Sequence, residues 1–153
     1  MQPFSKLLAD LADAISAAEK YLRFATLLQQ QDLTAEICTE AGSEGRFYRF
    51  DGGRMTSQSG LVQDPDVELV FRSPDIALKV LSPDREHAAW VEGVKNLRIR
   101  LLGDELKAIW FHEILVGATE APVYFSATPT ALTWATGSGG SPTVLPAGRC
   151  TCT

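Results

Sequence analysis

The sequence has few of the residues on which catalysis and metal binding usually depend. Two histidines, His87 and His112, and three cysteines occur among its 153 residues. The segment His112-Glu-Ile-Leu-Val116 comes nearest to a zinc motif, but Val116 stands where that motif needs a second histidine. Cys150 and Cys152 supply two thiolates, fewer than the four ligands of a structural zinc site. We therefore expect no metal site and no cofactor.

Motifs for nucleophilic catalysis and nucleotide binding are also missing. The chain has no Gly-x-Ser-x-Gly segment and no phosphate loop ending in Gly-Lys-Ser/Thr, and Gly137-Ser-Gly-Gly140 opens no helix. Nothing in the pattern places a histidine beside Cys38, which we interpret as a small buried apolar residue of a strand. His87 is expected in solvent, and His112 at the surface or the edge of the core. We expect no catalytic residue and a protein that is not an enzyme.

Clustered positive charge and long apolar runs are absent as well. The net charge is -5, the pI is near 5.0, and no cluster of Lys and Arg with interleaved aromatics occurs, which argues against nucleic acids and anionic membranes. No apolar run approaches the ~20 residues of a membrane span, and the first residues lack the pattern of a signal peptide. Of the three cysteines only Cys38 lies within the expected core, so the core cannot contain a disulfide. A reducing compartment is therefore expected by default. We expect a cytoplasmic protein with a neutral or hydrophobic partner.

The sequence contains enough apolar material for one folded domain followed by a tail. Hydrophobic residues make up 45% of the chain, which is ordinary for a domain of this length. After Gly117 the only charges are Glu120 and Arg149, and small and polar residues dominate. We therefore expect a domain over residues 1–117 and a low-charge tail over 118–153. Apolar residues of this tail could dock as a short strand or a lid: Val123, Tyr124, Phe125, Leu132 and Trp134.

Residues 4–31 are predicted to form one long helix, because apolar residues recur at three-and-four spacing without an internal glycine or proline. The stripe consists of Phe4, Leu8, Leu11, Ile15, Ala18, Leu22 and Ala25. Alternating segments then predict strands near residues 33–39, 46–50 and 54–60, the last of them polar and near the sheet edge. Asp51-Gly-Gly53 predicts a tight hairpin between the second and third strands.

Residues 65–117 form the most ordered pattern of the chain. Alternation predicts a strand over residues 66–72, and Ser73-Pro-Asp75 predicts the start of a short helix. Ser82-Pro-Asp84 repeats this signal for a second short helix that carries Trp90 and ends at Gly93. Another strand is predicted over residues 96–102, with Leu97, Ile99 and Leu101 inward and Arg98 and Arg100 outward. After Gly103-Asp104 we expect a last helix bearing Leu106, Ile109, Trp110, Phe111, Ile114 and Leu115.

These elements together predict an α+β fold with about five mainly antiparallel strands covered by helices. The segments Asp66-Val67, Ser73-Pro-Asp75, Gly93, Leu97-Arg-Ile-Arg100 and Gly103-Asp104 resemble the pattern of the sterol carrier protein type 2 family over about residues 30–117. Nine residues separate Gly93 from Gly103, several more than is usual in that family. We therefore expect this strand or its approach to be lengthened.

The resemblance implies a lipid, acyl chain or other long apolar molecule held in a tunnel between sheet and helices. The candidate lining residues are Val67, Leu69, Phe71, Ile76, Val80, Trp90, Leu97, Ile99, Leu101, Ile109 and Trp110. Two functions stay open. One is the non-catalytic binding or carrying of a sterol, fatty acyl or isoprenoid lipid. The other is an accessory or protein-interaction domain with a filled core, acting on a partner or a second copy through its amino-terminal helix or its tail.

Overall fold

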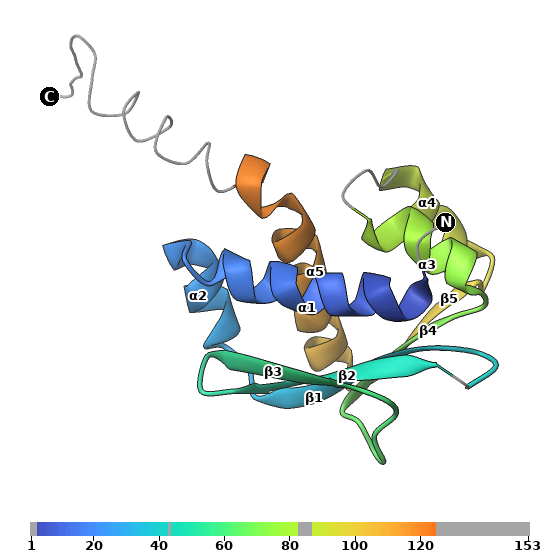
Figure 1. The fold of residues 1–153 in the computed structure, drawn as a ribbon, viewed down its shortest axis with the longest axis horizontal. Helices are drawn as coiled ribbons and strands as arrows, with labels where there is room; N and C mark the ends of the chain where they lie inside the picture. Colours follow the sequence, from blue (N-terminus) through green and yellow to red (C-terminus); the bar gives the residue numbers. More distant parts are fainter. Residues whose placement is uncertain (1–2, 43, 83–86, 125–153) are drawn as a thin grey trace, which may run out of the picture. The chain divides into compact units, whose positions relative to one another are not determined.

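A five-stranded sheet carries the helices on one of its faces (Figure 1). The computed structural model describes residues 3–42, 44–82 and 87–124, and residues 1–120 form one compact unit. The strands are β1 (Leu33–Thr39), β2 (Gly45–Asp51), β3 (Arg54–Ser59), β4 (Val67–Phe71) and β5 (Ile99–Gly103). The helices are α1 (Phe4–Ala18), α2 (Leu22–Leu28), α3 (Pro74–Leu81), α4 (His87–Lys95) and α5 (Glu105–Tyr124). The expected α+β class is confirmed.

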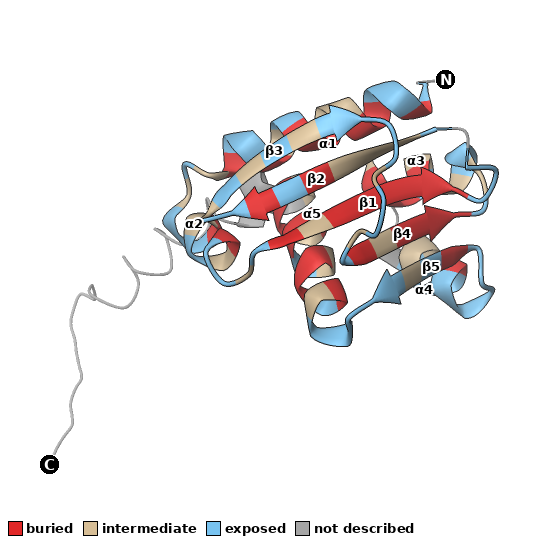
Figure 2. Ribbon diagram, turned by 90° about the horizontal axis from the view of Figure 1, so that it is seen from below, coloured by how far each residue is buried: buried red, intermediate tan, exposed pale blue. Residues whose placement is uncertain are grey.

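The strand order is β3-β2-β1-β4-β5, and three of the four pairings are antiparallel. The polar strand β3 lies at one edge, as predicted. The pairing of β1 with β4 is parallel, so the sheet is mixed. To reach β4 from the edge strand β3, residues 60–66 cross the face of the sheet that points away from the helices (Figure 2).

The predicted hairpin tip is confirmed at Gly52 and Gly53. Both have positive φ, 60° and 83°, and Asp51 pairs with Arg54 across the turn. Two successive left-handed residues make the two-residue turn that fits the twist of the flanking strands, and glycine adopts them at the lowest cost. Asp32 Oδ1 accepts a hydrogen bond from Gly52 N at 2.9 Å, which ties the turn to the start of β1.

The expectation of one helix over residues 4–31 is wrong, because the helix breaks at residues 19–21 into α1 and α2. A continuous helix would place Leu22 on the stripe of Ile15 and Ala18, but Leu22 is 81% exposed. Phe24 and Leu28 are instead fully buried. Since no glycine or proline marks the break, we attribute it to the burial of this second apolar pair.

The prediction of a strand over residues 96–102 is wrong for its first three residues. Leu97 was expected to point inward but is 67% exposed, and β5 begins only at Ile99. The N–H of Arg98 donates to the carbonyl of Gly93 and the N–H of Leu97 to that of Val94, the two bonds of a Schellman helix end. Leu97 holds the left-handed position of this motif, with φ 59°, so it belongs to the end of α4.

Gly93 was expected to end its helix but lies buried inside α4. A Cβ at this position would lie 2.6 Å from Ile99 Cγ1, closer than side chains can approach. The absence of a side chain therefore lets Ile99 pack against α4. The predicted start of this helix at Ser82-Pro-Asp84 falls largely outside the described residues.

Asp104 begins α5 as predicted, since its Oδ1 accepts a hydrogen bond from Lys107 N at 3.0 Å. Trp110, Phe111, Ile114 and Leu115 are buried, but Leu106 and Ile109 are 72% and 51% exposed. These two residues share the outer face of α5 with Glu113, which is also exposed. Leu106 and Ile109 therefore lie outside the core.

The helix α5 continues through Gly117 to Tyr124 and so passes the expected start of the tail. The rest of the tail, with Phe125, Leu132, Trp134, Cys150 and Cys152, lies outside the described residues. Within the part of the chain that is described, no helix combines the length and apolar character needed to cross a membrane.

Candidate functional site

A cleft of about 230 Å³ lies at the corner where α3 and α4 meet. The residues that line it are Ile76, Lys79, Val80, Ala88, Ala89, Glu92, Gly93 and Arg98. Ile76, Lys79 and Val80 come from α3 and the others from α4 and its end. Figure 1 shows these two short helices side by side above the end of the sheet formed by β4 and β5.

Local sequence explains why this corner is hollow. Ser73 is extended and Pro74 occupies the first position of α3, so the chain leaves β4 and turns directly into the helix. Across the cleft, α4 presents Ala88 and Ala89, whose small side chains leave the space unfilled. A short helix with small residues on its inner face therefore borders the cleft.

The lining combines an apolar part with a charged part. Ile76, Val80 and the alanines supply apolar surface, whereas Lys79, Glu92 and Arg98 bring two cations and one anion. Such a set can hold an apolar segment and place a polar end group near a cation. Binding pockets usually measure about 300–1,000 Å³, so a cleft of this size would enclose only part of a long chain.

The centre of the domain, in contrast, is filled by aromatic packing. Trp110 is buried, its ring meets that of Phe50 edge-on at 5.0 Å, and its Nε1 donates a hydrogen bond to Leu27 O at 2.9 Å. Tyr48 is fully buried, and its hydroxyl donates to Leu8 O at 2.8 Å. Burial raises the pKa of Tyr48, so this hydroxyl stays protonated. These contacts fasten α1, α2 and α5 to the sheet.

The structure separates the eleven candidate lining residues into five groups. Buried residues of the helix-covered sheet face are Val67, Leu69, Phe71 and Ile99. Ile76 and Val80 line the cleft. Trp110 belongs to the aromatic centre, and Trp90 and Leu101 are half-buried. Leu97 and Ile109 are exposed, so they lie outside the core.

His112 lies where it was expected, at the edge of the core. It is half-buried, and its ring lies 4.6 Å from that of Trp90, between centroids, at an interplanar angle of 37°. This contact joins α5 to α4. The side chain of His87, in contrast, lies outside the described set.

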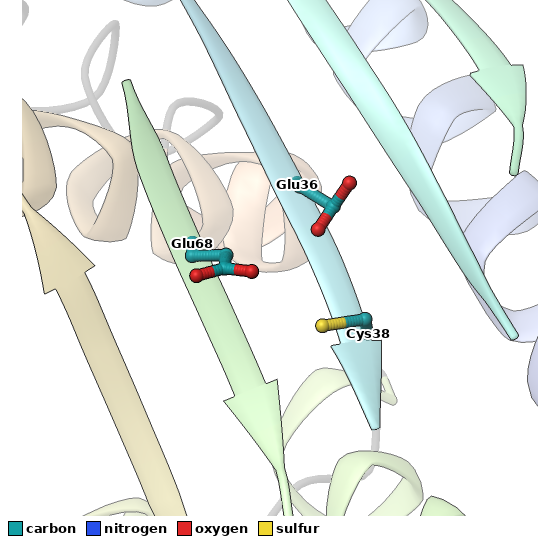
Figure 3. A group of neighbouring side chains, drawn as sticks. All are labelled: Glu36, Cys38 and Glu68. Carbon is teal, nitrogen blue, oxygen red and sulfur yellow. The ribbon is translucent and has the colours of Figure 1, made fainter. Parts of the chain in front are cut away.

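A second cluster of side chains was not recognised from the sequence. Glu36, Cys38 and Glu68 gather on the sheet face away from the helices (Figure 3), with one ligand atom of each within 4.8 Å of the others. Cys38 is buried as expected, and burial followed by the charges of Glu36 and Glu68 raises its pKa to about 11. Burial also raises the pKa of Glu36, against a hydrogen bond from Val62 N that lowers it. The alternation of polar and apolar residues in each strand indicates which side chains share a face. It does not show that β1 and β4 pair in parallel, and this pairing is what brings the three side chains together.

Comparison with known proteins identifies a shared fold. No protein-family model matches the chain, and no curated protein matches it. The sterol carrier protein domain 2 of Helicoverpa armigera superimposes with a TM-score of 0.57 at 13% identity, over 78% of this chain and 93% of that one. A UbiJ-SCP2 ubiquinone synthesis protein gives 0.51 at 13% identity, over 76% and 99%. Apo sterol carrier protein 2 from Yarrowia lipolytica gives 0.51 at 15% identity, over 71% and 86%.

Proposed function

From a fold shared with sterol carrier protein 2 domains, we propose that this protein binds or carries a long apolar molecule without catalysing a reaction. The observation that carries the proposal is the cleft between α3 and α4, which is lined by apolar residues and by the charged residues Lys79, Glu92 and Arg98. The ligand's apolar chain enters at this corner. Its polar end stays near Lys79 and Arg98.

The shallow packing of α4, which contacts α5 through the half-buried Trp90, supports ligand entry here. Among its residues from Ala88 to Lys95, only Gly93 is buried, and Val91 and Val94 are exposed. A helix that buries so little apolar surface opens at a low free-energy cost compared with the core. Displacement of α4 would enlarge the cleft and admit more of a chain than the present volume holds.

The energetics favour a long chain over a small molecule. Burial of one methylene is worth about 0.8 kcal/mol, so sixteen carbons gain roughly 12 kcal/mol, against an association cost of about 4–15 kcal/mol. The cations add a preference for an anionic end group, because a charge-assisted hydrogen bond to a carboxylate is stronger than a neutral one. Fatty acyl ligands therefore fit this cleft better than sterols do.

Two measurements on the purified protein test the proposal. Organic extraction followed by mass spectrometry should recover a long-chain lipid, and a fluorescent fatty acid should be displaced by palmitate more strongly than by the corresponding alcohol or by cholesterol. Equal displacement by all three would contradict the head-group preference. Absence of both extractable lipid and fluorescent-ligand binding would reject lipid binding.

A second candidate, an accessory or interaction domain, is favoured by apolar side chains that face solvent. The most exposed of these in the described chain are Leu22, Leu106, Leu97, Val91 and Ile109. Exposed apolar residues of this size often mark contacts with other proteins when they are contiguous. Sedimentation analysis should then show self-association that Leu106→Glu abolishes, whereas a monomer that retains lipid binding would support the carrier.

A further inference from the structure

The group Glu36, Cys38 and Glu68 is built by the parallel pairing of β1 and β4. Glu36 lies directly opposite Glu68 in the register, and Cys38 follows two residues later on the same face of β1. Figure 3 shows the Cys38 sulfur pointing from β1 toward the space next to the two carboxylates. One oxygen of each glutamate and Cys38 Sγ lie within 4.8 Å of one another. Three electron-pair donors therefore converge on one point.

The connection from β3 to β4 covers this group. Val62 N donates a hydrogen bond to Glu36 Oε2 at 2.6 Å. Leu61 lies over Gly45, which pairs with Cys38, and a Cβ on Gly45 would be only 2.5 Å from Leu61 Cδ2. As a result Glu36 and Cys38 are 3% and 6% exposed. A polar group placed so far from water requires a partner.

Cys38 lacks such a partner in the described part of the chain. Its sulfur makes no disulfide, and no hydrogen bond to it is found among the described residues. The charged side chains that face it are Glu36 from β1, Glu68 from β4 and Arg100 from β5. Glu36 and Glu68 are close enough to share a hydrogen bond when one of them is protonated, and a divalent ion in place of that proton would be bound by both carboxylates and the sulfur.

We propose that Glu36, Cys38 and Glu68 bind a divalent metal ion of the zinc type on the helix-free face of the sheet. A thiolate with two carboxylates suits Zn²⁺, whereas Mg²⁺ and Ca²⁺ prefer oxygen ligands alone. Three protein ligands leave a fourth tetrahedral position for water or a ligand group. This site is separate from the α3–α4 cleft and does not depend on lipid binding.

The surroundings fit such an ion. The formal charges of two carboxylates and one thiolate are balanced by a divalent ion together with Arg100, which lies opposite Val70 on the same face. The hydrogen bond from Val62 N orients Glu36, as outer-shell donors do for carboxylate ligands. Ligand atoms around zinc are about 3.5 Å apart, so the three atoms must converge by about 1 Å. The half-buried Glu68 can supply this movement by rotating its side chain.

The test uses the full chain with Cys150→Ser and Cys152→Ser, so that Cys38 is the only thiol. Titration with Co²⁺ should produce a sulfur-to-cobalt charge-transfer absorption that saturates at one ion per chain and is reversed by Zn²⁺ but not by Mg²⁺. Calorimetry with Zn²⁺ should give the same stoichiometry. Absence of the charge-transfer band in this folded background would overturn the proposal.

Three further variants in this background assign the ligands. Cys38→Ser should abolish the absorption. Glu68→Gln should weaken Zn²⁺ binding by at least about 10-fold, because even the loss of a residue that only supports a ligand costs that much. Glu113→Gln, at an exposed carboxylate on the outer face of α5, should leave binding unchanged. If Cys38→Ser fails to fold, as judged by circular dichroism, the comparison of Glu68→Gln with Glu113→Gln tests the site. Equal Zn²⁺ binding by these two variants would reject it.

Discussion

The helices cover the sheet unequally. The centre of the domain is tightly packed, whereas a cleft remains at the corner between α3 and α4, and we connect the centre with stability and the corner with binding. In the centre, Trp110 and Tyr48 are buried and each donates a hydrogen bond to a helix carbonyl. At the corner, α4 buries only Gly93 among its residues from Ala88 to Lys95, and a cleft remains. We infer that the centre supplies most of the folding free energy, whereas the corner is left able to admit a ligand.

The largest expected effect comes from truncating the centre. Trp110→Ala should lower the free energy of unfolding by about 3–5 kcal/mol, because it removes a packed aromatic and its hydrogen bond to Leu27. Urea denaturation measures this loss, and fluorescent-acid binding by the folded fraction should persist. The half-buried Trp90 provides the comparison, since Trp90→Ala should cost clearly less. A small stability loss for Trp110→Ala together with lost binding would show that Trp110 lines the ligand site instead.

A single buried hydrogen bond in the centre should have an intermediate effect. Tyr48→Phe removes the donor to Leu8 O without changing the volume of the ring, and should cost about 1 kcal/mol. Urea denaturation checks the value. If Tyr48→Phe left stability unchanged, the hydroxyl would not be fastening α1 to the sheet.

At the corner, one substitution should stabilise the protein. Leu97 holds a left-handed conformation that glycine adopts without strain, so Leu97→Gly should raise the free energy of unfolding by roughly 0.5–1 kcal/mol. Leu97→Ala is the matched control, because it removes the exposed side chain but keeps the Cβ and hence the strain. A destabilising Leu97→Gly would mean that the side chain makes a contact that outweighs this strain.

The smallest effect concerns pH. Asp66 accepts a hydrogen bond from Thr34 N at 2.8 Å, and this bond, assisted by Lys107, lowers the pKa of Asp66 below its usual 3.8. The ionised carboxylate therefore stabilises the folded state above the unfolded pKa, and this contribution is lost as the pH falls through the folded pKa. Asp66→Asn should be less stable than the parent near neutral pH, with the difference shrinking below about pH 4. A difference that stays constant down to pH 2 would contradict this cause.

Local patterns in the sequence were enough to predict most of the sheet. The alternation over residues 33–39, the Asp51-Gly-Gly53 turn and the strand near residues 66–72 all appear as expected, because each depends on neighbours in the chain. The break at residues 19–21 and the left-handed Leu97 were not predictable in this way. They depend on burial of Phe24 and Leu28 and on the packing of Ile99 against α4.

The candidate site was predicted less well than the fold. Only Ile76 and Val80 of the expected lining residues border the cleft, because its shape depends on how α4 meets α3. Glu36 and Glu68 were separated by 31 residues in the sequence and became neighbours only through the parallel pairing of β1 and β4. Periodicity identifies which face a residue occupies but not which strand lies beside it.

The most direct test of the account is to fill the cleft and measure fatty-acid binding. Ala89→Phe should weaken binding of a fluorescent fatty acid by more than about 10-fold, since excluding two methylenes already costs about 1.6 kcal/mol. Ala17→Phe, on the exposed side of α1, makes the same substitution away from the cleft and should bind like the parent. Equal binding by both variants, with both folded, would contradict a ligand site between α3 and α4.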